Sequence, residues 1–316
     1  MLPAKKGIAG LVAATRVHQN QSSRPIDLRA VSAFFTGALA YADTVMIAVG
    51  TTDSATLASI QQTAQAAEQA ASRAPGTVLV LQVTPWGQFT PALNALLCAA
   101  ASAGAPLILF QSLETAATPA LVSALEAELD PAQDLVVGAA LPGHDFSPGE
   151  HEITGTTTPW NTLALWSVPQ LARLGFLTVS DGAVAGVAAG VEEVAAISLL
   201  QQLRHSGGSG GGGSATRECR AKLLCLEGAT WEAEWEDDAR RSWHASKMAS
   251  KRQRAAAQMA ALCARPGRVL HIDRRLGGGG SGGGNGSGGS HGGSGGSHGG
   301  SGGDSGGGGG GSGGGD

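Results

Sequence analysis

Two hydrophobic patterns alternate along the first 141 residues. Short continuous apolar runs are typical of strands buried on both faces, and the segments between them place apolar residues at helical spacing. The runs predict strands at 7–17, 44–50, 77–83, 106–112 and 134–141. The intervening segments predict helices at 25–42, 54–74, 91–104 and 118–130, with Ser54 as the cap of the second.

Strands joined by helices of this length form right-handed crossovers. We therefore predict an α/β fold, a doubly wound and mostly parallel sheet with helices on both faces. Ligands of such sheets bind at the carboxyl ends of the strands. Here these ends are Arg16–Gln21, Gly50–Asp53, Thr84–Phe89 and Ser112–Thr115.

The pattern changes after Leu141. A long loop, 141–161, leads into a strand at 162–168, a short helix at 169–175 and a helix at 191–204. Further strands are predicted at 221–227, 231–235 and 267–273, around a long helix at 237–264.

Glycine is concentrated in two low-complexity segments, the insert 206–214 and the tail 277–316. Such segments have no apolar surface to offset the entropy of ordering, so both are predicted to be disordered. Residues 1–276 are then one domain that contains the flexible insert. His291 and His298 in the tail leave open a metal-binding role, but a spacer is the simpler interpretation.

Charge and hydropathy exclude some classes of partner. The formal net charge is −4, which gives no reason to expect nucleic acid as a partner. No apolar run reaches the roughly 18–20 residues needed to span a bilayer. Residues 1–17 loosely imitate a signal peptide, but a first core strand explains them better, so we expect a cytoplasmic protein. The cysteines lack C-x-x-C spacing, which indicates reduced thiols; they are Cys98, Cys219, Cys225 and Cys263.

Five short motifs in the correct order resemble a family 2-type glycosyltransferase with the GT-A fold, over about residues 8 to 204. Ile47-Ala48-Val49-Gly50-Thr51-Thr52-Asp53 is similar to the family's V-D-D-G-S-T-D loop, and Ala92-Leu93-Asn94-Ala95 to its A-R-N-x-G stretch. Ser112-Leu113-Glu114 stands at the place of the D-x-D metal motif. Gly175-Phe176 resembles the G-G-F corner, and GVEEVAAISLL the G-E-D-x-x-L stretch that supplies the catalytic base.

The resemblance implies transfer of a sugar from a nucleotide-diphosphate donor to an acceptor hydroxyl. It implies a base at Glu193 or Glu192 and one metal ligand at Glu114, with Mn²⁺ or Mg²⁺ as the cofactor. The implied donor-binding residues are Gly50, Thr51, Thr52, Asp53, Asn94 and Ser112. Lys247 and Lys251 lie outside the stretch that carries the resemblance and are donor-binding candidates because of their place in a row of cations on the long helix. The candidate acceptor-binding residues are Trp160, Asn161, His144 and Asp145.

Two departures from the family pattern stand out. Ala48-Val49 replaces the acid that usually contacts the nucleobase, and Ser112-Leu113-Glu114 keeps a single carboxylate. One carboxylate with phosphates and waters is still able to hold Mg²⁺. Glu114 is equally interpretable as an ordinary acid after a buried strand.

Each residue assigned to this chemistry also has an ordinary structural interpretation. Paired acids raise one another's pKa, which suits base work, but Glu192 and Glu193 also simply favour a positive helix N-terminus. His144-Asp145 is also interpretable as a loop turn. A row of cations on the long helix fits either diphosphate binding or a solvated face; it comprises Arg240, His244, Lys247, Lys251 and Arg254.

Three functional classes follow. The first is a glycosyltransferase with a degenerate metal motif. The second, motivated by Ala48-Val49 and Ser112, is a non-catalytic relative that binds a nucleotide or sugar or serves as a scaffold. The third, a nucleotidyltransferase, is disfavoured because a glycine-rich basic loop should follow the first strand, where this chain has VHQNQSSRP.

Overall fold

The computed structural model describes residues 10–19, 25–87, 89–206, 219–231, 242, 246 and 248–275. These residues belong to one compact unit, Met1–Gly277. The remaining positions include the insert 206–214 almost entirely and the tail 277–316, so the predictions made for those segments lie outside the described residues. The strand predicted at 231–235 also lies outside them, except for Trp231.

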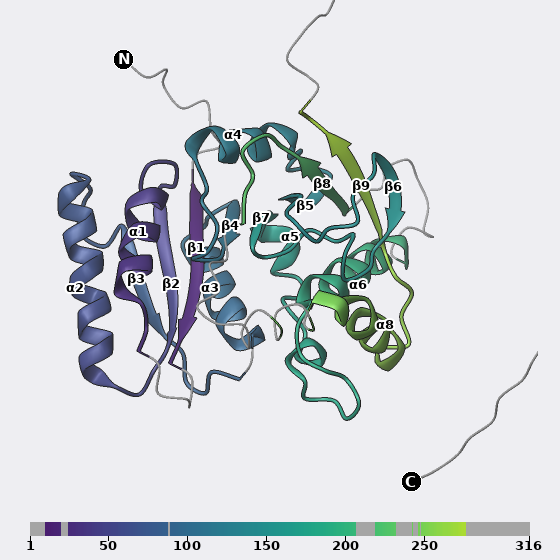
Figure 1. Cartoon of the computed structure of the whole chain (residues 1–316), viewed down its shortest axis with the longest axis horizontal. Helices are drawn as coiled ribbons and strands as arrows, with labels where there is room; N and C mark the ends of the chain where they lie inside the picture. The colour runs from purple at the N-terminus through teal and green to yellow at the C-terminus, as the bar shows by residue number, and fades with distance from the viewer. Residues whose placement is uncertain are drawn as a thin grey trace, which may run out of the picture. The chain divides into compact units, whose positions relative to one another are not determined.

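The described elements alternate as the sequence predicts in the first half of the chain (Figure 1). The strands are β1 (Leu11–His18), β2 (Thr44–Gly50), β3 (Val78–Gln82), β4 (Leu107–Gln111), β5 (Asp134–Ala139), β6 (Gly149–Glu152), β7 (Leu163–Ser167), β8 (Arg220–Cys225) and β9 (Arg268–Asp273). The helices are α1 (Leu28–Ala38), α2 (Ser54–Ala70), α3 (Thr90–Ser102), α4 (Pro119–Glu128), α5 (Val168–Leu171), α6 (Glu192–Ser206) and α8 (Lys251–Ala261), with a 3₁₀ turn η1 (Thr178–Asp181).

All nine described strands form one sheet in the order β3-β2-β1-β4-β7-β5-β8-β9-β6. The strands run parallel except β7, which is antiparallel to β4 and β5, and β6, which is antiparallel to β9. The predicted mostly parallel α/β sheet is therefore confirmed. Strand order reverses between β1 and β4, which makes the carboxyl edge at this point the expected position of a ligand.

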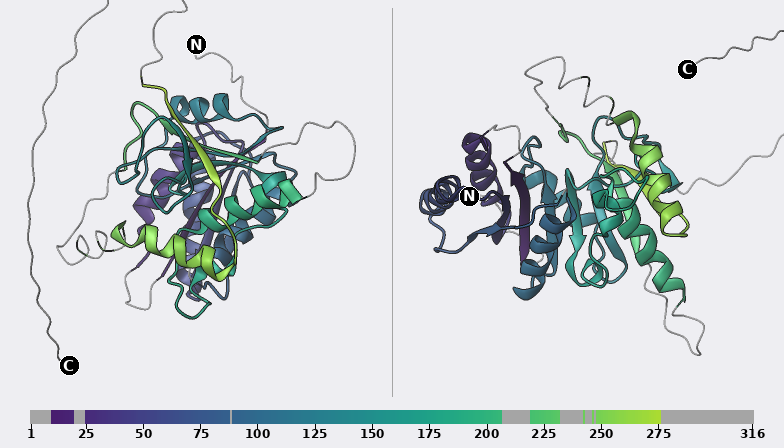
Figure 2. Two further views of the ribbon diagram at one scale, coloured as in Figure 1. Left: turned by 90° about the vertical axis from the view of Figure 1, so that its right-hand side faces the viewer. Right: turned by 90° about the horizontal axis from the view of Figure 1, so that it is seen from below.

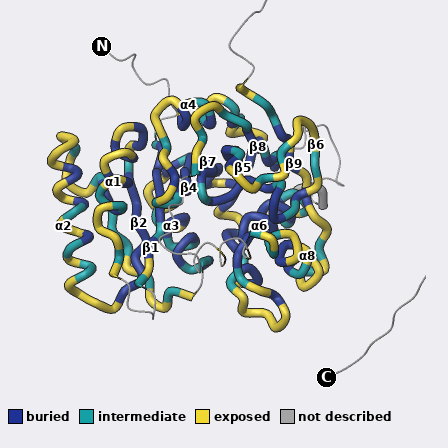
Figure 3. The backbone as a smooth tube through the Cα atoms, in the orientation of Figure 1, coloured by how far each residue is buried: buried dark blue, intermediate teal, exposed yellow. Residues whose placement is uncertain are grey.

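Two hydrophobic layers enclose the sheet, and Figure 3 shows that β2, β4, β5 and β7 are largely buried between them. Alternate side chains of each strand point to opposite faces, so Ala14 and Phe110 pack with α3, α5, α6 and α8, while Ala13 and Leu109 pack with α1, α2 and α4. The left view of Figure 2 looks along the sheet, with α4 above it and α8 below. Helices on both faces are thus confirmed.

Three local predictions are wrong. Asp53, rather than Ser54, caps α2, because its carboxylate accepts the backbone N–H groups of Ala55 and Thr56. The loop predicted at 141–161 contains the edge strand β6, which was missed because its sequence GEHE has no apolar alternation. The long helix predicted at 237–264 is not continuous, because Ser250 is a turn residue and α8 begins only at Lys251.

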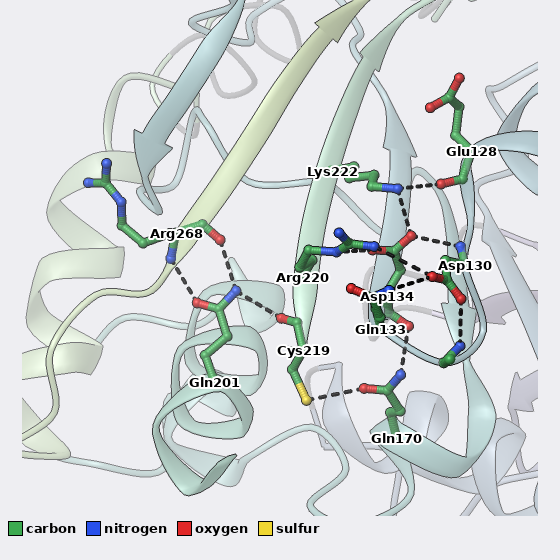
Figure 4. Close-up of polar contacts among 11 residues, drawn as sticks. Glu128, Asp130, Gln133, Asp134, Gln170, Gln201, Cys219, Arg220, Lys222 and Arg268 are labelled. Carbon is green, nitrogen blue, oxygen red and sulfur yellow. Dashed lines mark hydrogen bonds and ion pairs between the residues drawn. The ribbon is translucent and has the colours of Figure 1, made fainter. Parts of the chain in front are cut away.

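A buried ion-pair cluster lies at the amino ends of β5 and β8 (Figure 4). Asp134 is fully buried and contacts Arg220 Nε at 2.8 Å and Lys222 Nζ at 2.6 Å. Its Oδ2 also accepts the backbone N–H of Asp130 at 2.7 Å. Because β4 and β5 both run antiparallel to β7, this cluster lies at the sheet edge opposite to the carboxyl end of β4. We define these four residues as the Asp134 cluster.

Candidate functional site

Two adjacent glutamates begin helix α6 at the carboxyl edge of the sheet. Glu192 and Glu193 are each 4% exposed, and the helix starts at Glu192, within one residue of the predicted start. They lie near the strand reversal because Arg16, at the end of β1, contacts Glu192 through Nη2 and Oε1 at 3.1 Å. The two glutamates are called the carboxyl pair below.

Asn161 joins the carboxyl pair to the sheet. Its backbone N–H donates to Glu193 Oε1 at 2.5 Å, and its Nδ2 lies 3.4 Å from Glu192 Oε1. Its Oδ1 accepts from Trp166 Nε1 at 2.9 Å. Asn161 precedes β7, whose first residue pairs with Gln111 at the end of β4. A residue predicted to bind the acceptor and the two predicted bases therefore meet at one place.

Burial and charge perturb the carboxyl pair. Loss of solvent, followed by repulsion from Glu192, raises the pKa of Glu193 from 4.5 to about 8. The N–H of Asn161 and the charge of Lys251 act in the opposite direction. Two carboxyls this close share protons and titrate as a pair, so the pair holds a proton at neutral pH while Arg16 stabilises its negative charge.

The raised pKa of Glu193 predicts a pH-dependent stability. The unfolded chain loses this proton near pH 4.5 and the folded chain near pH 8, so the free energy of unfolding falls as pH rises through this window. The slope is at most about 1.4 kcal/mol per pH unit. Glu193→Gln is expected to remove it, as measured by urea unfolding at pH 5 and pH 8. The control is the exposed Glu114→Gln, which should keep the wild-type slope; equal slopes for wild type and Glu193→Gln would contradict the prediction.

The rings of Trp160 and His144 stack on each other beside Lys251. Their centroids lie 3.5 Å apart, and Lys251 Nζ lies 2.9 Å from the centroid of Trp160. Trp160 is 3% exposed, and its Nε1 donates to Gly155 O. Lys251, predicted to bind the donor, is thus placed against a residue predicted to bind the acceptor.

His144 is neutral in the folded protein. Burial lowers its pKa to about 3. Its Nδ1 lies 2.9 Å from the backbone nitrogen of Leu141 and its Nε2 lies 3.0 Å from Thr158 O. This pattern fits the tautomer with hydrogen on Nε2. Asp145 points elsewhere, pairing with Arg252, and hydrogen bonds from Thr156 and Arg252 lower its pKa.

The indole of Trp86 covers Gly50 in the predicted donor loop. A Cβ on Gly50 would lie 2.3 Å from the Trp86 ring, and His18 stacks on the same ring at 5.3 Å. Thr51 Oγ1 donates to Gln19 Oε1 at 2.9 Å. The carboxylate of Asp53 caps α2, and its hydrogen bonds lower its pKa. Thr52, between them, is exposed.

Asn94 holds the corner at Gly175-Phe176. Its Nδ2 donates to Phe176 O and its Oδ1 accepts the N–H of Phe176, both at 2.8 Å. Gly175 has a φ of +71°, and a Cβ there would lie 2.9 Å from Asn94 Oδ1. The two stretches that carry the resemblance therefore contact each other, and both ends of the Asn94 amide are used in that contact.

Ser112 and Glu114 do not fit a protein-held metal by themselves. Ser112 Oγ lies 3.0 Å from Thr115 Oγ1, and Glu114 is exposed. Within the part of the chain that the structure describes, no three His, Cys, Asp or Glu side chains gather as a metal site would require. Metal use stays a prediction that depends on the phosphates of a donor.

The cations predicted to share one helix face are not equivalent. Arg254 is 8% exposed and lies inside the molecule, so its placement on a solvated face is wrong. Its Nη1 donates to Ala189 O at 2.8 Å. Arg240, His244 and Lys247 lie outside the described residues. Sequence reasoning also gave Arg16 no role, although a cation near the end of an otherwise apolar strand was a usable signal.

Comparisons with known proteins give little guidance. No known protein family matches the sequence, and no curated protein is similar to it. A crystal structure of S. aureus TarS 1-349 aligns with 14% sequence identity and a TM-score of 0.31, over 58% of this chain and 52% of that chain. The chain thus spans about half the length of that structure.

None of the described helices has both the length and the apolar character that crossing a bilayer requires.

Proposed function

We propose that this protein transfers a sugar from a nucleotide-diphosphate donor to an acceptor hydroxyl. The observation that carries the proposal is the carboxyl pair at the strand reversal, joined to Arg16 and Asn161. Acceptor activation needs a base within hydrogen-bond reach, and a leaving diphosphate needs positive charge. Both groups are supplied within one cluster of side chains.

The roles divide within the pair. Glu193 is protonated at neutral pH because its pKa is raised to about 8. Glu192 is the member of the pair that faces a cation, because it contacts Arg16 at 3.1 Å. We assign Glu192, which contacts Arg16, as the carboxylate that takes the acceptor proton, and Glu193 as the buried partner that fixes the position of the pair through the N–H of Asn161. The Arg16 side chain is 27% exposed, against 6% for that of Glu192, and it is the cation that would meet the diphosphate.

The test is thermal unfolding of the full chain with UDP, GDP, CDP and their sugars, with and without Mn²⁺. A ligand at 100 times its dissociation constant should add about 2.7 kcal/mol, a rise of roughly 5–10 °C for a domain of this size. Arg16→Gln is expected to lose most of the shift. The matched control is Arg29→Gln, an exposed arginine on α1, which should keep it.

One observation favours a second candidate, a non-catalytic nucleotide- or sugar-binding protein. Trp86 covers Gly50, and Asp53 is committed to capping α2, so the predicted donor loop offers few free polar groups. This candidate predicts that a donor raises the unfolding temperature and that none of the donors is turned over. A panel with no shift would contradict both candidates.

A further inference from the structure

The turn that precedes the carboxyl pair has an unfavourable backbone. Gly190 has a φ of +108° and Val191 a φ of +52°. A β-branched residue rarely adopts a left-handed conformation, and it persists there only where surrounding contacts hold it. Glu192 follows immediately and begins α6. The conformation of this turn therefore decides where both carboxyl groups lie.

Helix α8 holds this turn through two buried side chains. Arg254 Nη1 donates to Ala189 O at 2.8 Å, and Gln258 Nε2, one helical turn further, donates to Gly190 O at 2.5 Å. Gln258 also accepts from Ser180 Oγ at 3.3 Å, and the Gly190 N–H donates to Ser180 O at 2.8 Å. A Cβ on Gly190 would lie 2.4 Å from Arg254 Nη1. The φ of +108° favours glycine at position 190, and a side chain there would also displace the guanidinium of Arg254.

Arg254 also interacts electrostatically with the carboxyl pair. Burial lowers the pKa of Arg254, while the charges of Glu192 and Glu193 both act to raise it. The other charged groups that act on the pair are Arg16 from β1 and Lys251 from α8. Arg254 therefore differs from Gln258, which contacts the neighbouring carbonyl without a charge.

We propose that Arg254 is a positioning residue that holds the Gly190–Val191 turn and balances the charge of the carboxyl pair. It acts through Ala189 O and through Glu192 and Glu193, and it needs no contact with substrate. The inference rests on the proposed function only for its effect on turnover. The two structural roles of Arg254 are tested by unfolding measurements, which need no substrate. A result that contradicts this inference is therefore separate from a result that contradicts the proposed function.

The test compares the free energy of unfolding of Arg254→Gln and Arg254→Lys with wild type at pH 5 and pH 9. More carboxylate charge faces Arg254 at the higher pH, so Arg254→Gln is expected to lose more stability at pH 9 than at pH 5. Arg254→Lys keeps the charge and should lose a similar amount at both values. The matched control is Arg252→Gln on the same helix. Arg252 pairs with Asp145 at the surface, so its loss should leave the pH dependence of the unfolding free energy unchanged. Equal losses for Arg254→Gln at both pH values would overturn the proposal.

A second measurement covers the case in which Arg254→Gln does not fold. In a Glu192→Gln/Glu193→Gln background the cation has no charge to balance, so adding Arg254→Gln should have a much smaller effect. Folding of this triple variant supports the proposal. Failure of the triple variant to fold, while the double variant folds, would show that Arg254 stabilises the turn without the pair and would overturn its role in balancing the charge of the pair.

Discussion

The double variant Glu192→Gln/Glu193→Gln is expected to release nucleoside diphosphate from its sugar donor about 10²–10⁴ times more slowly than wild type. Glutamine keeps the size of glutamate and one acceptor oxygen, but it takes no proton at neutral pH. The N–H of Asn161 still finds an acceptor in the amide oxygen at position 193, and the lost Arg16 contact is partly exposed. The fold should therefore survive while base catalysis is removed.

The single variants separate the two roles. Glu192→Gln should lose nearly as much activity as the double variant, because Glu192 is the carboxylate assigned to take the acceptor proton. Glu193→Gln should lose less, and its pH–rate profile should shift because the repulsion between the two carboxyls is gone. Glu227→Gln, an exposed acid that follows β8, is the matched control for loss of a carboxylate. Wild-type rates for Glu192→Gln would remove Glu192 from the reaction.

The second large effect concerns stability. Asp134→Ala is expected to destabilise the protein by about 3–5 kcal/mol, because it leaves two cations of the Asp134 cluster without their buried partner. The side chain of Asp134 is 0% exposed, and that of Lys222 only 11%. The Lys222 ammonium would keep its hydrogen bond to Glu128 O at 2.6 Å, but that carbonyl carries no charge to balance it (Figure 4).

The measurement is equilibrium urea unfolding at neutral pH. The matched control is Glu150→Gln, which breaks an ion pair between Glu150 and Arg268 whose side chains are 60% and 55% exposed. That change should lower the free energy of unfolding by less than about 1 kcal/mol. Because the cluster lies at the edge opposite to the carboxyl pair, the folded fraction of Asp134→Ala should keep its activity. If Asp134→Ala lowers the free energy of unfolding no more than Glu150→Gln does, the stabilising role of the Asp134 cluster is contradicted.

The first half of the fold is predictable because its patterns are local. The run 44–50 matches β2 residue for residue, since a strand buried on both faces is continuously apolar and ends at Gly50. The second half depends on tertiary pairing. Strand β6 pairs with β9 although its own residues are polar and mostly exposed, so no periodicity in positions 149–152 reveals it.

The site was predictable in part. The acidic start of α6 and the position of Asn161 before β7 both follow from local sequence, and the structure brings them together. The contact from Arg16 spans 176 positions in the chain, so no local pattern contains it. Arg254 was misjudged for a similar reason. Helical spacing groups it with other cations, but only packing against the Gly190 turn shows that it is buried.

The central claim is that the carboxyl pair performs sugar transfer, and turnover tests it most directly. Full-length wild type is incubated with each nucleotide-diphosphate sugar, with and without Mn²⁺, and release of nucleoside diphosphate is followed over time. The account predicts release from at least one donor and its loss in Glu192→Gln. A donor that binds with a clear thermal shift but is never cleaved, whatever metal is present, would contradict the transferase and leave the binding protein in its place.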